Sequence, residues 1–237
     1  MPIIPSTLEY DKTSLDNKLR LLYDNYDFCK KITGQNRFEL HVDIVYKSFA
    51  QDRSVLSSLR LVDVINTINL SLSIDIYKSI DRPHLSIHLM ANKEDWPQLL
   101  KDLKMLEALK NIDFELYLPS WFNLLMFPIK SQNWGYWLDL IEWQNCIIEG
   151  VIDTRKLRNK YNIKSKKVLI MTVPAGVSGQ KTNNAIQAQA VAVSASLGKE
   201  NVILDGGWKL EDITALGQGL RVVSYGSFWN RLELELY

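Results

Sequence analysis

The sequence contains little of three things: cysteine, net charge and long apolar runs. Cys29 and Cys146 are the only cysteines in 237 residues, too few for a disulfide framework, so we expect a cytoplasmic protein. The net charge is +1, with 28 Lys and Arg against 27 Asp and Glu, which argues against a nucleic-acid partner. No apolar run approaches the ~18 residues that a membrane span needs, so no membrane partner is expected.

What is present is the composition of an ordinary globular protein, with 46% apolar and 23% charged residues. Short apolar runs alternate with helical patterns, and a chain of this length suits one α/β barrel. The runs expected to be strands are Ile3–Thr7, Phe38–Val45, His84–Met90, Asp113–Ser120, Cys146–Asp153, Lys166–Val173, Asn201–Gly207 and Arg221–Ser227. Eight strands alternating with helices predict a parallel (β/α)8 TIM barrel, as a single domain covering residues 1–237.

Helical spacing of apolar residues predicts the outer layer of this barrel. The expected helices are Leu15–Ile32, Ser54–Ile68, Asn92–Leu109, Asn184–Leu197 and a short last helix, Phe228–Tyr237. Residues 121–143 hold four of the seven tryptophans. We interpret that segment as the core-facing side of a helix, although aromatics at this density also suit the interface of a homo-oligomer.

Two strands carry polar residues on one face. His41 and Asp43 alternate along the second strand, and His84, Ser86 and His88 alternate along the third. Polar strand residues often face water, and a single buried His is more often a satisfied core residue than a ligand. Two His beside a carboxylate at a barrel mouth shift the interpretation towards a metal site.

Glycines follow the last three expected strands. Gly176 and Gly179 lie in the loop after the sixth strand, the pair at 206–207 follows the seventh, and Gly226 follows the eighth. Glycine lets backbone N–H groups approach an anion closely, although an ordinary glycine turn explains the first of these loops equally well. Because the ends of strands seven and eight often bind phosphate in barrels, their convergence favours a phosphate site.

Taken together, these segments resemble the ribulose-phosphate 3-epimerase family. The matching segments are Pro5-Ser6, His41–Val45, His88–Met90, Met171–Gln180, Leu204–Gly207 and Gly226-Ser227, in the order and roughly the spacing of the family. The resemblance covers nearly the whole chain, and it implies a barrel of the ribulose-phosphate-binding type.

The resemblance implies reversible epimerisation of D-ribulose 5-phosphate to D-xylulose 5-phosphate, so the expected partner is a small-molecule sugar phosphate. It also implies one divalent metal ion (zinc, iron, manganese or cobalt) held by His41, Asp43, His88 and Asp205. Asp43 and Asp205 would be the general acid and base. The implied substrate- and phosphate-binding residues are Ser6, Met90, Met171, Gly176, Ser178, Gly179, Gly206, Gly207, Gly226 and Ser227.

The chain departs from the family pattern in the loops. Val45 replaces the family's Met, Tyr46-Lys47 its Asp-Gly, Pro174-Ala175 its Asn-Pro, and Ser178 its first Gly of a pair. These changes alter the surroundings of the sugar and remove no implied ligand. Two alternatives therefore stay open: an epimerase of another ketose phosphate, and a diverged sugar-phosphate-binding protein with little catalysis.

Overall fold

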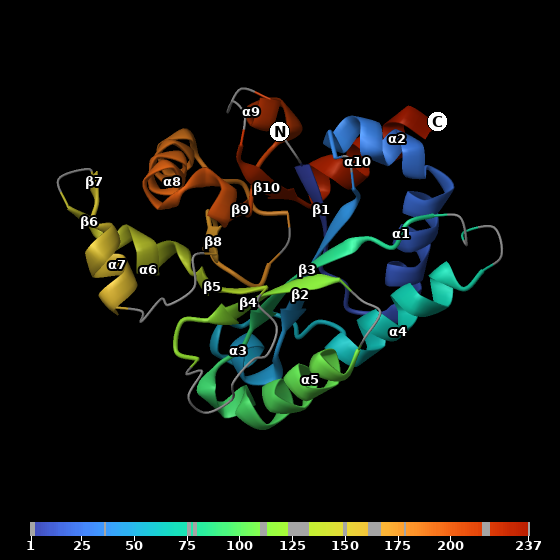
Figure 1. Ribbon diagram of the computed structural model, residues 1–237, viewed down its shortest axis with the longest axis horizontal. Coiled ribbons are helices and arrows are strands. Elements are labelled where there is room, and N and C mark those ends of the chain that lie inside the picture. The colour runs from blue at the N-terminus through green and yellow to red at the C-terminus, as the bar shows by residue number, and fades with distance from the viewer. Residues whose placement is uncertain are drawn as a thin grey trace.

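A closed barrel of eight parallel strands forms the centre of the molecule, as the computed structural model shows (Figure 1). The structure describes residues 3–35, 37–74, 77, 80–109, 113–122, 133–148, 151–160, 167–177, 179–214 and 219–236. Around the barrel the strands follow the order β1 (Ile3–Thr7), β10 (Arg221–Ser224), β9 (Val202–Asp205), β8 (Lys167–Met171), β5 (Trp134–Leu138), β4 (Phe114–Pro119), β3 (His84–Met90) and β2 (Glu39–Val45). The predicted (β/α)8 barrel is confirmed.

Helices surround the barrel on its outside (Figure 1). They are α1 (Lys12–Asp24), α2 (Tyr26–Thr33), α3 (Lys47–Asp52), α4 (Leu61–Leu72), α5 (Trp96–Ala108), α6 (Leu140–Gln144), α7 (Thr154–Lys160), α8 (Asn184–Leu197), α9 (Leu210–Thr214) and α10 (Gly226–Leu236). Short 3-10 turns lie at Lys93–Asp95 and Lys199–Asn201. In the part of the chain that is described, no helix is long and apolar enough to cross a bilayer.

Alternation along the strands separates two apolar layers. Leu40, Val42 and Ile44 of β2 point outwards and join the large cluster between strands and helices. Val45 joins a smaller cluster inside the barrel, together with Met90 and other inward-facing residues. His41 and Asp43 share the face of Val45, as predicted from their spacing, and the structure shows that this face is buried inside the barrel.

The fifth barrel strand was predicted wrongly. It is β5, Trp134–Leu138, and not residues 146–153. In the latter segment Ile147–Ile148 and Val151–Ile152 form a separate antiparallel pair, β6 and β7, at the edge of the molecule (Figure 1). The sequence holds a signal for this: two apolar pairs are separated by two residues of which the second is a glycine, a spacing that suits a short hairpin better than one continuous strand.

The helical interpretation of residues 121–143 is wrong at β5, and among the described residues of this segment it holds for 140–143, which lie in α6. Trp134 and Trp137 lie on β5, where Gly135 lets β8 approach so closely that an added Cβ would lie 2.5 Å from the carbonyl oxygen of Lys167. Trp143 lies on α6, and both it and Trp137 are buried, whereas Trp121 and Trp134 are only partly buried, so the predicted burial holds for two of the four tryptophans. Residues 123–132 of the segment lie outside the described ranges.

Several predicted boundaries move. The helix predicted at Leu15–Ile32 is two helices that meet at Asn25, and the one predicted from Ser54 begins only at Leu61, after an extended stretch. Ser54 itself has a left-handed backbone (φ 56°), which ends α3 and redirects the chain. The eighth strand ends at Ser224, so that Gly226 and the following serine begin α10.

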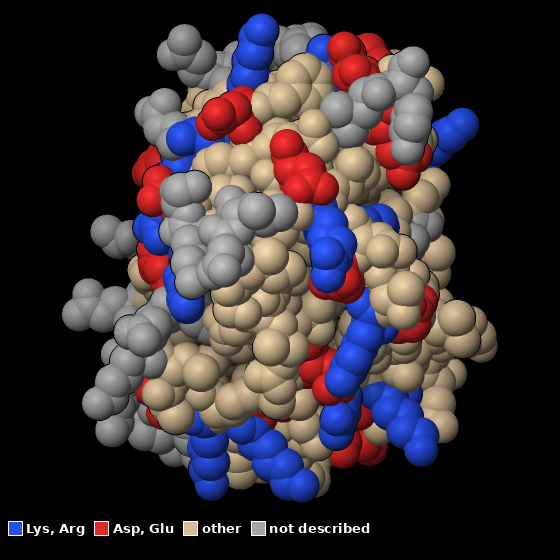
Figure 2. Space-filling model, turned by 90° about the vertical axis from the view of Figure 1, so that its right-hand side faces the viewer, with Lys and Arg blue, Asp and Glu red and all other residues tan. Residues whose placement is uncertain are grey.

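Positive and negative side chains are interleaved on the face of the molecule seen in Figure 2, on the side of α1 and α4. The whole chain is balanced in the same way, with 28 basic and 27 acidic residues.

Candidate metal centre

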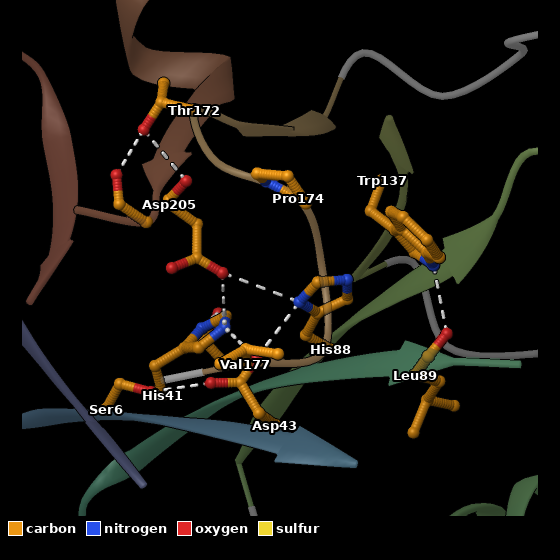
Figure 3. Close-up of polar contacts among 12 residues, drawn as sticks. Ser6, His41, Asp43, His88, Leu89, Trp137, Thr172, Pro174, Val177 and Asp205 are labelled. Carbon is orange, nitrogen blue, oxygen red and sulfur yellow. Dashed lines mark hydrogen bonds and ion pairs between the residues drawn. The ribbon is translucent and has the colours of Figure 1, made fainter. Parts of the chain in front are cut away.

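Four predicted residues converge inside the carboxyl end of the barrel. His41 and Asp43 come from β2, His88 from β3, and Asp205 from the last position of β9 (Figure 3). Asp43 lies beside His88 in the β2–β3 register, whereas β9 is separated from β2 by β1 and β10. Asp205 therefore approaches the other three across the barrel interior.

The four side chains present one ligand atom each to a common point. Asp43 Oδ1 lies 3.3 Å from His41 Nε2 and 3.1 Å from His88 Nδ1. Asp205 Oδ2 lies 3.6 Å from His41 Nε2 and 3.5 Å from His88 Nδ1. All four side chains are buried, and both imidazoles have no exposed surface. Four protein atoms thus form a ring of alternating oxygen and nitrogen.

Neighbouring residues orient two of the four ligands. The Ser6 hydroxyl donates a hydrogen bond to Asp43 Oδ2 at 2.7 Å, and the outer nitrogen of His41, Nδ1, lies 3.0 Å from Ser86 Oγ. On the inner side, His41 Nε2 is buried without a hydrogen bond of acceptable alignment in the described structure. Orphaned buried nitrogens cost free energy unless a ligand satisfies them.

The electrostatics of the cluster favour its ionised form. Burial alone would lower the pKa of His41, but Asp43 and Asp205 outweigh it and raise that pKa to about 10. Burial would raise the pKa of Asp43, but His41 and His88 outweigh it and hold that pKa well below its usual range. Two carboxylates packed this closely need compensating positive charge, from protonated imidazole or from a cation.

A divalent metal ion fits the four residues. Each offers one ligand atom, and these atoms all lie within 4.8 Å of one another. Ligands ~2.1 Å from one ion lie roughly 3.0–3.5 Å apart, which is close to the spacing between the carboxylate and imidazole atoms. The mixed nitrogen and oxygen set suits zinc, iron, manganese or cobalt. Ser86 at the outer nitrogen of His41 is the kind of partner that orients a metal-bound imidazole.

A pocket opens above the cluster and encloses about 460 Å³, its mouth included. Asp43 and Asp205 form part of its floor, and Ser6 lies beside them. The implied substrate-binding residues that line it are Ser6, Met90, Met171, Gly176, Gly179, Gly206 and Gly207. Val177 of the loop after β8 lines it too, and Figure 3 shows this side chain in front of the cluster. Ser178 lies outside the described residues.

A second pocket adjoins the first and contains the remaining implied residues, Gly226 and Ser227. The two pockets share the residues Gly179, Gln180, Gly207 and Tyr225. Lys181, Lys209 and the first turn of α10 also line the second pocket. Two lysines and the N-terminal end of an 11-residue helix make this pocket attractive to an anion.

Glycine is required where the two pockets meet. Gly206 and Gly207 have φ values of 102° and 76°, in the region that other residues rarely adopt. A Cβ at Gly206 would lie 2.3 Å from Val173 Cγ2, and one at Gly207 would lie 2.4 Å from the backbone nitrogen of Thr182. The loop after β8 therefore packs directly on the end of β9, and Thr172 completes that contact with a backbone hydrogen bond to Asp205 (2.7 Å).

Sequence reasoning did not single out three residues that matter to this geometry. Ser86 shares the face of His88, so its contact with His41 could have been read from strand pairing. Trp137 packs on His88 with a ring-centroid distance of 4.9 Å, and it was hidden by the helical interpretation of its segment. Tyr225 lines both pockets, and nothing in the neighbouring sequence predicts that it does so.

Comparison with known proteins adds no relatives. Neither the models of known protein families nor the curated proteins searched match this chain. The functional interpretation therefore depends on the residues of this protein and on their geometry.

Proposed function

We propose that this protein is a metal-dependent epimerase that interconverts D-ribulose 5-phosphate and D-xylulose 5-phosphate. One observation carries the proposal: Asp43 and Asp205, from strands that are not neighbours, face each other across two imidazoles at the floor of a pocket. Two carboxylates beside a metal site are what a reaction needs when one proton leaves a carbon and another returns to its opposite face.

The chemistry requires removal of a proton from the carbon next to a ketone. When bound, a divalent ion supplies the positive charge that stabilises the enediolate oxygens. Asp43 and Asp205 lie one on each side of the substrate plane, where either can remove the proton while the other returns one to the opposite face, depending on the direction of the reaction. Ser6 holds Asp43 through its Oδ2 atom, so that Oδ1 stays directed at the two imidazoles. The apolar side chains of Met90, Met171 and Val173 keep water from the reacting carbon.

The second pocket supports a phosphate at the other end of the substrate. It adjoins the first, with which it shares lining residues, and Lys181 and Lys209 supply positive charge. The buried indole nitrogen of Trp208, which also lines it, has no hydrogen-bond partner among the described residues. A ketose phosphate joins a reacting carbon to an anion within one short molecule, which is the layout that these two pockets accommodate.

The proposal is tested by NMR with D-ribulose 5-phosphate in deuterated water, in the presence of zinc, iron, manganese or cobalt. We expect D-xylulose 5-phosphate carrying deuterium at the third carbon, because the returning proton comes from solvent. Asp205→Asn should abolish both exchange and conversion. Asp27→Asn, an exposed carboxylate on α2 outside both pockets, is the matched control and should leave them unchanged.

Other outcomes separate the alternatives. No exchange with any of the four metals would refute the pentulose epimerase, and the same assay with ketohexose phosphates would then test another substrate. A protein that binds sugar phosphate while holding no metal would be a binding protein. Stoichiometric divalent metal, measured by elemental analysis, would favour an epimerase.

A further inference from the structure

The two imidazoles of the metal centre have different surroundings on their outer side. His41 turns Nε2 towards the carboxylates and has Ser86 Oγ 3.0 Å from its outer nitrogen, Nδ1. His88 is turned the other way, with Nδ1 towards the carboxylates and Nε2 outside. That outer nitrogen is buried and has no hydrogen-bond partner in the described structure. A metal-bound imidazole normally donates its outer N–H to a polar partner, so His88 lacks the usual means of orientation.

Trp137 lies on the side of His88 where a polar partner of the outer nitrogen would be expected. Its indole packs on the His88 ring with centroids 4.9 Å apart and planes at 66°, an edge-to-face arrangement. In Figure 3 the side of the His88 ring that carries Nε2 is turned towards Trp137. An indole face is negative and attracts an N–H group, although more weakly than an oxygen acceptor does.

The indole is itself held from two sides. Its Nε1–H donates a hydrogen bond of 2.9 Å to the carbonyl oxygen of Leu89, the residue next to His88. Phe49 of α3 packs against it edge-on, with centroids 5.9 Å apart. Trp137 is only 5% exposed, so it has little freedom to turn. A ring fixed in this way can fix its neighbour.

We propose that Trp137 is a positioning residue for the metal centre, an aromatic counterpart of Ser86. By stabilising the proton on Nε2 of His88, it leaves Nδ1 unprotonated and directed at the ion. The inference depends on the metal site within the proposed function, and not on the identity of the substrate.

The test is cobalt binding, measured on chelator-treated protein by competition with a chromophoric chelator and by the visible spectrum of bound Co²⁺. Loss of an orienting partner costs metal affinity roughly tenfold or more, so we expect about that loss in Trp137→Leu. Trp137→Phe keeps an aromatic face and should restore affinity and spectrum close to those of wild type. Trp134→Leu, on the same strand but outside the pockets, is the matched control.

The outcomes distinguish this inference from the metal site itself. Unchanged cobalt affinity in Trp137→Leu, or equal losses in the Leu and Phe variants, would overturn the positioning role. Failure of wild-type protein to bind Co²⁺ would overturn the metal centre as well.

A second measurement needs no variant and therefore does not depend on whether Trp137→Leu folds. Long-range ¹H–¹⁵N NMR of zinc-loaded protein should show His88 protonated at Nε2 and His41 protonated at Nδ1. A proton on Nδ1 of His88 would contradict the proposal.

Discussion

The two ends of the barrel interior both hold buried carboxylates, but they balance that charge with different partners. At the carboxyl end Asp43 and Asp205 face two imidazoles. At the amino end Glu39 and Glu115, near the starts of β2 and β4, face Arg221 at the start of β10. An imidazole can lose its positive charge, whereas a guanidinium cannot. The carboxyl-end cluster can therefore release a proton or give up its imidazole protons to make room for a metal ion. At the amino end the charge of Arg221 always neutralises the carboxylates.

The hydrogen bonding at the amino end is also complete. Arg221 bonds both Glu39 and Glu115, and Lys167 Nζ lies 2.6 Å from the second oxygen of Glu115. The hydroxyl of Tyr117 adds a hydrogen bond of 2.9 Å to Glu115. Glu39, His84 and Glu115 also lie close enough together to suggest metal ligands. Because Arg221 bridges the two carboxylates, their charge is already balanced by protein groups and no ion is needed there.

The sharpest test of the comparison is removal of a carboxylate from the carboxyl end. Asp43→Asn should lower turnover about 10²- to 10⁴-fold, because it removes an acid/base group that also contacts both imidazoles. Its stability should fall less than that of the amino-end variant below, since the buried imidazoles can become neutral whereas Arg221 cannot. NMR of substrate conversion measures the effect on turnover, and calorimetry on the same sample measures the effect on stability. Near-normal turnover would refute the role of Asp43.

The corresponding change at the amino end should have the opposite consequence. Glu115→Gln leaves the charge of Arg221 incompletely paired inside the barrel and should cost about 3 kcal/mol of unfolding free energy. Turnover of the folded variant at low temperature should stay close to wild type, because no pocket residue is touched. Urea unfolding measures the first effect. A variant as stable as wild type would show that this charge cluster contributes nothing to the fold.

Acidification should weaken the amino end in a defined range. Burial would raise the pKa of Glu115, but Arg221 and Lys167 outweigh it and lower that pKa to about 2 from an ordinary 4.5. A depressed folded-state pKa contributes stability above the unfolded pKa, and that stability is lost as the pH falls from about 4.5 to about 2. Glu39, whose pKa is raised chiefly by burial, opposes this effect in part.

The expected net loss is on the order of 2 kcal/mol. This acid-induced loss of stability should be absent in the Glu115→Gln variant, which is tested by comparing its urea unfolding midpoints with those of wild type at several pH values. If both proteins lose stability equally over this range, carboxylates other than Glu115 cause the acid sensitivity.

The smallest effect concerns the orientation of His41. Ser86→Ala removes the partner of its outer nitrogen and should weaken Co²⁺ binding about tenfold, at the lower end for such partners. Ser194→Ala, a buried serine on α8 that bonds its own helix backbone, is the matched control. Equal cobalt affinity in Ser86→Ala and wild type would show that strand geometry alone orients His41.

Some features of the site can be predicted from residues that are neighbours in the sequence, and others cannot. The inward direction of His41 and Asp43 followed from their spacing, since alternation along a strand is decided by the pleat itself. The same reasoning predicted the face shared by Ser86 and His88. It failed for the fifth strand, where Trp134–Leu138 carries aromatics that suit a helix or a strand equally, and only pairing with β4 and β8 selects the strand.

The sequence by itself determined the barrel class and the residues that each strand directs inwards, because both depend on periodicity over a few neighbouring positions. Only the tertiary structure decided which of those residues meet. Asp205 reaches the two imidazoles because closure brings β9 opposite β2 and β3, and Trp137 reaches His88 across β4. These contacts join positions far apart in the chain, and they depend on the register of every strand between them.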